Sequence, residues 1–149
     1  MKKATDSLLN DHKMIRKLLE GFQIDNPRFP EIANTLNRVV LTHAWFEDTV
    51  FLPVFKTKPL FVKKYLDELY EEHKDIEFFL KLIKKTALDA PQELNAYIKQ
   101  FRAIMDNHLK KEEDALFPLA ETILTNEGMN QLSSEMEKHQ SQAQKLFNS

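Results

Sequence analysis

A histidine and a glutamate, His108 and Glu112, stand four residues apart inside an otherwise apolar helical stripe. Residues at this spacing lie on one face of an α-helix, so both side chains are predicted to point the same way. The stripe repeats in steps of three and four residues through Leu94, Ile98, Phe101, Met105, His108, Glu112, Ala115 and Leu119. A buried carboxylate without a partner is costly, and a metal ion is the strongest counter-charge available. This stretch therefore predicts a metal-binding helix.

The chain contains a second copy of this arrangement. His43 and Glu47 have the same spacing in another stripe, and a proline follows each pair, at Pro53 and Pro118. Each pair is preceded by one more helical stripe with a histidine on its apolar side, and these two histidines are His12 and His73. The repeat therefore predicts two helical hairpins that each offer two histidines and one glutamate to the interior.

The pattern predicts an all-α fold, an antiparallel up-down four-helix bundle. The first helix is expected over residues 5–20, the second from Pro30, and the third and fourth around His73 and His108. Hairpins with short loops pack antiparallel, and two hairpins close into a bundle. The two prolines are expected to bend or end their helices. A short fifth helix is expected over about 129–147, so that residues 1–149 form a single domain with the core bundle at about 5–125.

Composition excludes several classes of function. The chain has no cysteine, which excludes disulfides, thiolate metal sites and iron–sulfur ligation. Its formal charge of -2 gives no reason to expect nucleic acid as a partner. The basic N-terminus runs into polar residues, and no stretch reaches the length of a membrane span, so no membrane association and a cytoplasmic location are expected.

Four imidazoles and two carboxylates in one interior suit two first-row transition ions. Nitrogen and oxygen donors without sulfur argue against copper(I) and favour iron, with zinc or manganese as the alternatives. A carboxylate from each hairpin can bridge two such ions. One histidine on an apolar stripe is more often a hydrogen-bonded core residue, but four of them on separate stripes, two with a glutamate partner, favour metal binding.

The doubled histidine and glutamate motif resembles the hemerythrin-like, or HHE cation-binding, domain family over about residues 5–125. The resemblance implies a four-helix bundle with a non-haem di-iron centre, two iron ions joined by an oxo or hydroxo bridge. It implies that the imidazole ligands are His12, His43, His73 and His108 and that the bridging carboxylates are Glu47 and Glu112. It also implies dioxygen or nitric oxide as the small diatomic ligand; a protein partner is unknown.

Four more residues are candidates for an extra ligand or for a place beside the ligands. Oxygen-carrying hemerythrins have a fifth histidine where this sequence has Glu77, which is expected to ligate, to hold a ligand imidazole or to lie in solvent. Asp48 and Glu113 directly follow the two glutamates and are expected beside the ligands or at the surface. His139 lies on a later stripe, where packing or helix capping is favoured over ligation.

Three functions fit this pattern. The preferred one is a di-iron protein that binds or senses dioxygen or nitric oxide without being a dedicated enzyme. The second is a di-iron redox enzyme that turns over peroxide or nitric oxide or repairs iron–sulfur centres. The third is an iron-responsive interaction module or an iron store.

Overall fold

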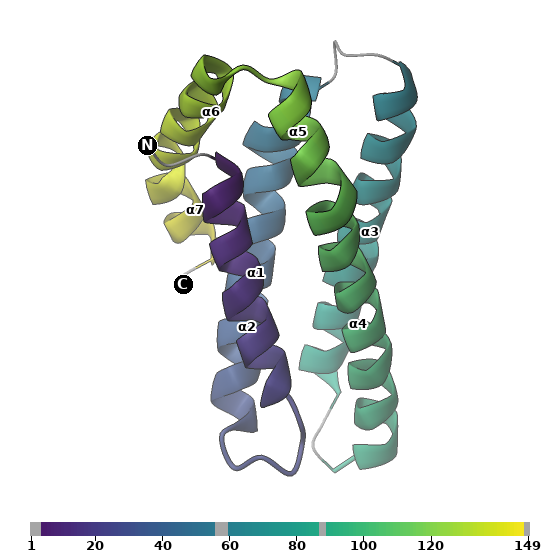
Figure 1. Ribbon diagram of the computed structural model, residues 1–149. Helices are drawn as coiled ribbons and strands as arrows, with labels where there is room; N and C mark the ends of the chain where they lie inside the picture. The colour runs from purple at the N-terminus through teal and green to yellow at the C-terminus, as the bar shows by residue number, and fades with distance from the viewer. Residues whose placement is uncertain (1–3, 56–59, 87–88, 148–149) are drawn as a thin grey trace.

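Four long helices stand side by side and alternate in direction (Figure 1). The computed structural model describes residues 4–55, 60–86 and 89–147, and those residues contain no β-strand. The four helices are α1 (Ala4–Glu20), α2 (Phe29–Phe46), α3 (Leu60–Lys85) and α4 (Pro91–Lys111). The prediction of an all-α antiparallel bundle is confirmed. Among the helices described, none has both the length and the apolar character needed to cross a bilayer.

Both inward-facing glutamates begin a π-helical turn. The helices α2 and α4 continue without a loop into η1 (Glu47–Phe51), η2 (Leu52–Phe55), η3 (Glu112–Leu116) and α5 (Phe117–Ile123). The N–H group of Leu52 donates to the Glu47 carbonyl oxygen, and that of Phe117 donates to Glu112. Proline is the next residue in both copies and has no N–H to continue the α-helical ladder. The chain therefore widens by one residue ahead of each proline, and after Pro118 it continues as a helix instead of ending.

A polar layer crosses the bundle between two apolar clusters. On α1, His12 lies between Leu8 of one cluster and Ile15 of the other. On α3, His73 lies in the same way between Leu69 and Ile76. The two clusters cover the layer from both ends of the bundle, because each stripe is apolar on both sides of its histidine. The histidines are thereby placed at one height in the bundle.

The C-terminal segment forms two helices, which corrects the prediction of one helix over 129–147. These are α6 (Asn126–Lys138) and α7 (Gln140–Phe147), and the chain bends between them at His139. Thr125 caps α6 by accepting a hydrogen bond of 3.0 Å from the Gly128 N–H. The bend lets α6 contact α1 and η1 while α7 contacts α2. Both helices cover the α1–α2 side of the bundle (Figure 1).

Candidate metal centre

Four histidines and two glutamates meet in the polar layer. The histidines come one from each long helix, and the glutamates are the first residues of the two π turns. Every one of the six is at most 6% exposed. The structure brings together all six residues that the sequence analysis proposed as metal ligands: His12, His43, Glu47, His73, His108 and Glu112.

Glu112 lies at the centre of the layer. Its Oε1 atom is 2.9 Å from His12 Nε2 and 3.5 Å from His43 Nε2. Its Oε2 atom is 3.3 Å from His108 Nε2. One carboxylate thus faces imidazoles from both hairpins, which is the position that a bridging ligand requires.

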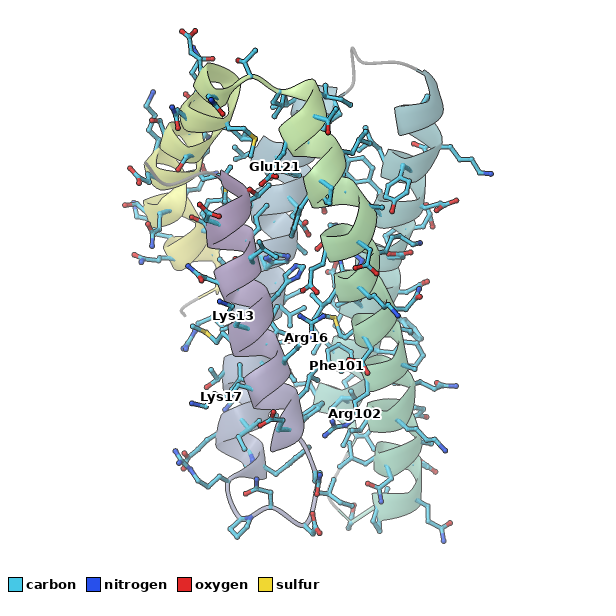
Figure 2. The ribbon with its side chains drawn as sticks, viewed as in Figure 1. Lys13, Arg16, Lys17, Phe101, Arg102 and Glu121 are labelled. Carbon is cyan, nitrogen blue, oxygen red and sulfur yellow. The ribbon has the colours of Figure 1, made fainter. Side chains whose placement is uncertain are left out.

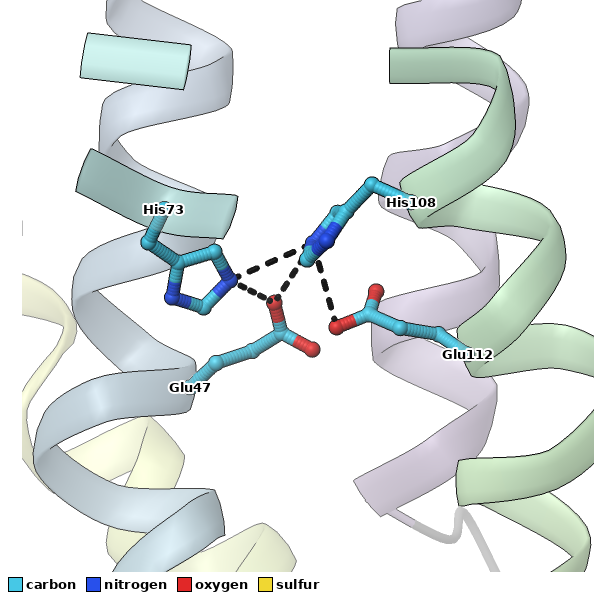
Figure 3. Close-up of side chains that lie close together, drawn as sticks. All are labelled: Glu47, His73, His108 and Glu112. Carbon is cyan, nitrogen blue, oxygen red and sulfur yellow. Dashed lines mark hydrogen bonds and ion pairs between the residues drawn. The ribbon is translucent and has the colours of Figure 1, made fainter. Parts of the chain in front are cut away.

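Glu47 occupies the matching position from the other hairpin, as Figure 3 shows. Its Oε1 atom is 3.1 Å from His73 Nε2, 3.2 Å from His43 Nε2 and 3.8 Å from His108 Nε2. The Nε2 atoms of His73 and His108 are 3.2 Å apart. Two imidazoles that share one ion at about 2.0–2.1 Å each would place their nitrogen atoms about 3 Å apart. The spacing fits a shared ion.

The donor atoms form two groups that overlap in Glu112. One group contains His12, His43 and Glu112, and its donor atoms lie within 4.8 Å of one another. The other contains Glu47, His73, His108 and Glu112, within the same limit. The arrangement therefore offers two neighbouring cation positions.

A second ring of four carboxylates holds the imidazoles from outside. Each Nδ1–H donates to one carboxylate while Nε2 faces inward, which fixes the tautomer and the ring orientation. The four bonds are His12–Glu113 at 2.7 Å, His43–Asp11 at 3.0 Å, His73–Asp48 at 2.6 Å and His108–Glu72 at 2.7 Å. We call Asp11, Asp48, Glu72 and Glu113 the outer carboxylates.

The outer carboxylates follow the internal repeat. Asp11 and Glu72 directly precede the first histidine of a hairpin and hold the second histidine of the same hairpin. Asp48 and Glu113 directly follow the inward glutamates and hold the first histidine of the opposite hairpin. The sequence analysis placed the latter two near the ligands or at the surface, and they contact the imidazoles. It missed Asp11 and Glu72, although an acidic residue directly before each first histidine was the available signal.

Two of the outer carboxylates are backed by a cation. Arg16 extends from α1 (Figure 2) and donates to both carboxylate oxygens of Glu113, at 2.5 and 3.0 Å. Lys111 donates to Glu72 and also approaches Glu68 at 3.6 Å. Bidentate arginine contacts of this kind are among the stronger hydrogen bonds in proteins. The carboxylates that orient the His12 and His108 imidazoles are therefore themselves fixed by Arg16 and Lys111.

In the absence of a metal ion, the charges of the layer raise the pKa of His43 and His73 and lower that of Glu47. Burial disfavours the charged form of His43, but Glu47, Asp11 and Glu112 outweigh burial and raise its pKa well above 6.5. Burial likewise opposes the charged form of His73, yet the bond to Asp48 and the two interactions with Glu47 raise its pKa to about 9. Burial favours the neutral form of Glu47, and the neighbouring imidazoles still lower its pKa.

The charges and the unsatisfied atoms both fit two cations. The two inner and four outer carboxylates exceed Arg16 and Lys111 by four charges when the imidazoles are neutral, and two divalent ions would balance this excess. Three buried atoms of the layer form no hydrogen bond, although two of them lie within 3.3 Å of a charged neighbour: His43 Nε2, Glu47 Oε2 and Glu112 Oε2. Buried polar groups are normally paired, and coordination of a metal ion would pair these atoms.

Two further candidates lie away from this centre. Of the three alternatives for Glu77, its position agrees with the one in solvent, because it lies on the exposed face of α3 and pairs with Lys81 at 3.0 Å. His139 was expected to pack or cap a helix rather than to ligate a metal, and its Nδ1 atom bonds the Glu135 carbonyl oxygen at the end of α6. Trp45 contacts the His139 ring, in keeping with packing and capping.

Comparison with known proteins agrees with this chemistry. The family model described as the hemerythrin HHE cation binding domain matches residues 3–120 and, in a second match, residues 64–149. The chain belongs to the hemerythrin HHE cation-binding family. A second match that begins within α3 is what a duplicated hairpin predicts.

One curated relative of this HHE chain is a protein of Nostoc sp. (strain PCC 7120 / SAG 25.82 / UTEX 2576) named "DNA nickase". The two are 25% identical over 141 residues, which cover 93% of this chain and 39% of the relative. The HHE chain therefore spans well under half of that protein. No solved structure matches the chain.

Neutralising an outer carboxylate should weaken metal binding. Glu113→Gln removes the charge that both His12 and Arg16 contact, and loss of such partners typically costs about 10–100-fold in metal affinity. Glu31→Gln is the matched control, because Glu31 also pairs with an arginine, Arg28 at 3.0 Å, but at the surface. Competition with a chelator of known affinity measures the change. Equal affinities for the two variants would contradict a role for Glu113 at the centre.

Proposed function

We propose that this chain is a non-haem di-iron protein that binds or senses dioxygen or nitric oxide at the centre formed by its four histidines and two glutamates. The proposal depends chiefly on one observation, the convergence of six buried nitrogen and oxygen donors into two overlapping groups. A donor set of imidazoles and carboxylates without sulfur suits iron, with zinc or manganese as rivals.

The chain's own residues prepare the site. Glu47 and Glu112 contact imidazoles of both hairpins, so each can bridge the two positions. The outer carboxylates fix the ring orientations, and the Phe117 ring packs against His12 with ring centres 5.3 Å apart. The apolar clusters cover the layer from both ends of the bundle and so limit the access of water. When bound, ferrous iron would supply the electrons that binding of dioxygen or nitric oxide requires.

Metal analysis of protein purified without added metal tests the identity of the ions. We expect about two iron atoms per chain, as a two-metal site predicts. Zinc or manganese in their place would contradict the iron proposal while leaving a metal centre. Less than one ion of any kind per chain, in protein that also fails to load on addition of metal, would contradict the centre itself.

Exposure of the anaerobic ferrous protein to dioxygen distinguishes binding from catalysis. A visible absorption band that forms with dioxygen and disappears under vacuum supports binding or sensing. Rapid irreversible oxidation with consumption of added peroxide supports a redox enzyme instead.

We propose no nucleic-acid partner, because the chain has a formal charge of -2.

A further inference from the structure

We propose that metal ions enter and leave the centre at one corner of the bundle, where His43 and Asp11 line a surface groove. This inference rests on the proposed metal-binding function and adds the route of exchange. The groove lies between α1, α2 and α7 and has a volume of about 390 Å³. Its walls include Asp11, Met14, Arg38, Thr42, His43 and Gln144. We call this groove the His43 port.

An inner imidazole and its outer carboxylate both line the His43 port. Two other grooves are lined by an outer carboxylate, but the imidazole that this carboxylate contacts is not part of their lining. One is lined by Glu113 together with Arg16, and the other by Glu72 together with Glu68. Within the described part of the chain, an ion in the His43 port is therefore separated from the centre by a single imidazole.

Asp11 is the outer carboxylate best placed to move aside. Its side chain is 37% exposed, against 25% for Glu113 and 17% for Glu72. Arg16 and Lys111 hold the latter two, whereas among the residues described the contact recorded for Asp11 is the one with His43. At 3.0 Å this contact is also the longest of the four bonds between an imidazole and an outer carboxylate.

Asp48 provides the comparison within the same structure. Its side chain is 38% exposed, much like that of Asp11, but it lies only 2.6 Å from His73 Nδ1. The inner nitrogen of His73 forms a hydrogen bond to Glu47, while His43 Nε2 lies 3.2 Å from Glu47 without the geometry of a hydrogen bond. Turning His43 outward breaks the bond to Asp11 and the 3.2 Å ion pair with Glu47, whereas turning His73 outward breaks the hydrogen bonds to Asp48 and Glu47 and the 3.2 Å contact with His108. His43 is thus the ligand that can open with the least loss.

Blocking the His43 port tests the proposal. The natural chain has no cysteine, so Gln144→Cys introduces a single thiol on the wall of the port that a bulky maleimide labels selectively. Gln131→Cys is the matched control, because Gln131 lies on α6 and lines a different groove. Uptake and release of Fe²⁺ without oxygen, and of Zn²⁺, are then followed with a chromogenic chelator before and after labelling.

Metal ions use the same passage for uptake and for release, so blocking it slows both rates equally and leaves the metal affinity unchanged. We expect labelled Gln144→Cys to take up and release metal at least ~10-fold more slowly at constant affinity, and labelled Gln131→Cys to keep the original rates. Unchanged rates in labelled Gln144→Cys, or equal slowing in both labelled proteins, would overturn the His43 port. Binding of zinc without iron would overturn the iron proposal alone, because the port is then measured with zinc.

A second pair of variants weakens the hydrogen bond that holds the imidazole in place, instead of blocking the groove. Asp11→Asn should speed metal release by more than Asp48→Asn, although the two aspartates are equally exposed. Melting temperatures of both variants separate this effect from a general loss of stability. Faster release from Asp48→Asn than from Asp11→Asn would place the exchange route at His73 and overturn the proposal.

Discussion

Replacing Glu112 by glutamine is expected to remove most of the bound metal, from about two ions per chain to less than one. Glu112 is the residue shared by both groups of donor atoms, and three imidazoles lie within 3.5 Å of its oxygens. The amide keeps the shape but loses the charge and one oxygen donor. Affinity should fall by more than ~100-fold, beyond the effect typical of outer partners. Metal content and a competitive titration measure the loss.

Glu77→Gln is the matched control for this variant. Glu77 is also a helical glutamate, but it pairs with Lys81 at the surface of α3. Its replacement should leave the metal content unchanged. If Glu112→Gln kept two ions at unchanged affinity while remaining helical by circular dichroism, the bridging position assigned to Glu112 would be wrong.

The bundle and its inward residues were predictable because helical periodicity is a local property. Steps of three and four residues determine which side chains share a helix face, and this places His108 and Glu112 together without knowledge of the other helices. The repeat of the motif then implied that the second pair, His43 and Glu47, faces the same interior. The six residues that meet in the structure are those that the stripes selected.

The outer carboxylates were only half predictable because their contacts cross between helices. Asp11 reaches His43 on the next helix, and Glu113 reaches His12 across the interface between the hairpins. Which partner a flanking carboxylate meets depends on the rotation of each helix, and periodicity leaves that rotation undetermined. Asp48 and Glu113 were considered because they adjoin a motif glutamate, and Asp11 and Glu72 were passed over.

The irregular backbone was also beyond prediction. Pro53 and Pro118 signal a disturbance in each helix, but proline is compatible with a kink, an end or a wider turn. The structure has a π turn in both copies, and in both the turn begins at the inward glutamate. The break at His139 has no neighbouring proline or glycine from which it could be predicted. It allows α6 and α7 to pack against different helices.

Removing the metal is expected to lower the melting temperature by about 8–16 °C. A ligand at about 1,000 times its dissociation constant stabilises the folded state by about 4 kcal/mol, and each kcal/mol shifts the melting temperature of a domain of this size by about 2–4 °C. Scanning calorimetry with and without a chelator measures the difference. Glu112→Gln is the control, because a variant that holds little metal should melt at the same temperature in both buffers.

The pH dependence of this difference follows from the imidazoles. The pKa of His73 is raised to about 9 when protons occupy the metal-free layer, so its proton stabilises that form fully below pH 6.5 and is lost as the pH rises through about 9. In the metallated form the imidazoles are already neutral, so its stability does not decrease over this pH range. The difference in melting temperature should therefore widen between pH 7 and about 9. A constant difference would mean that the ions are held somewhere other than among these histidines.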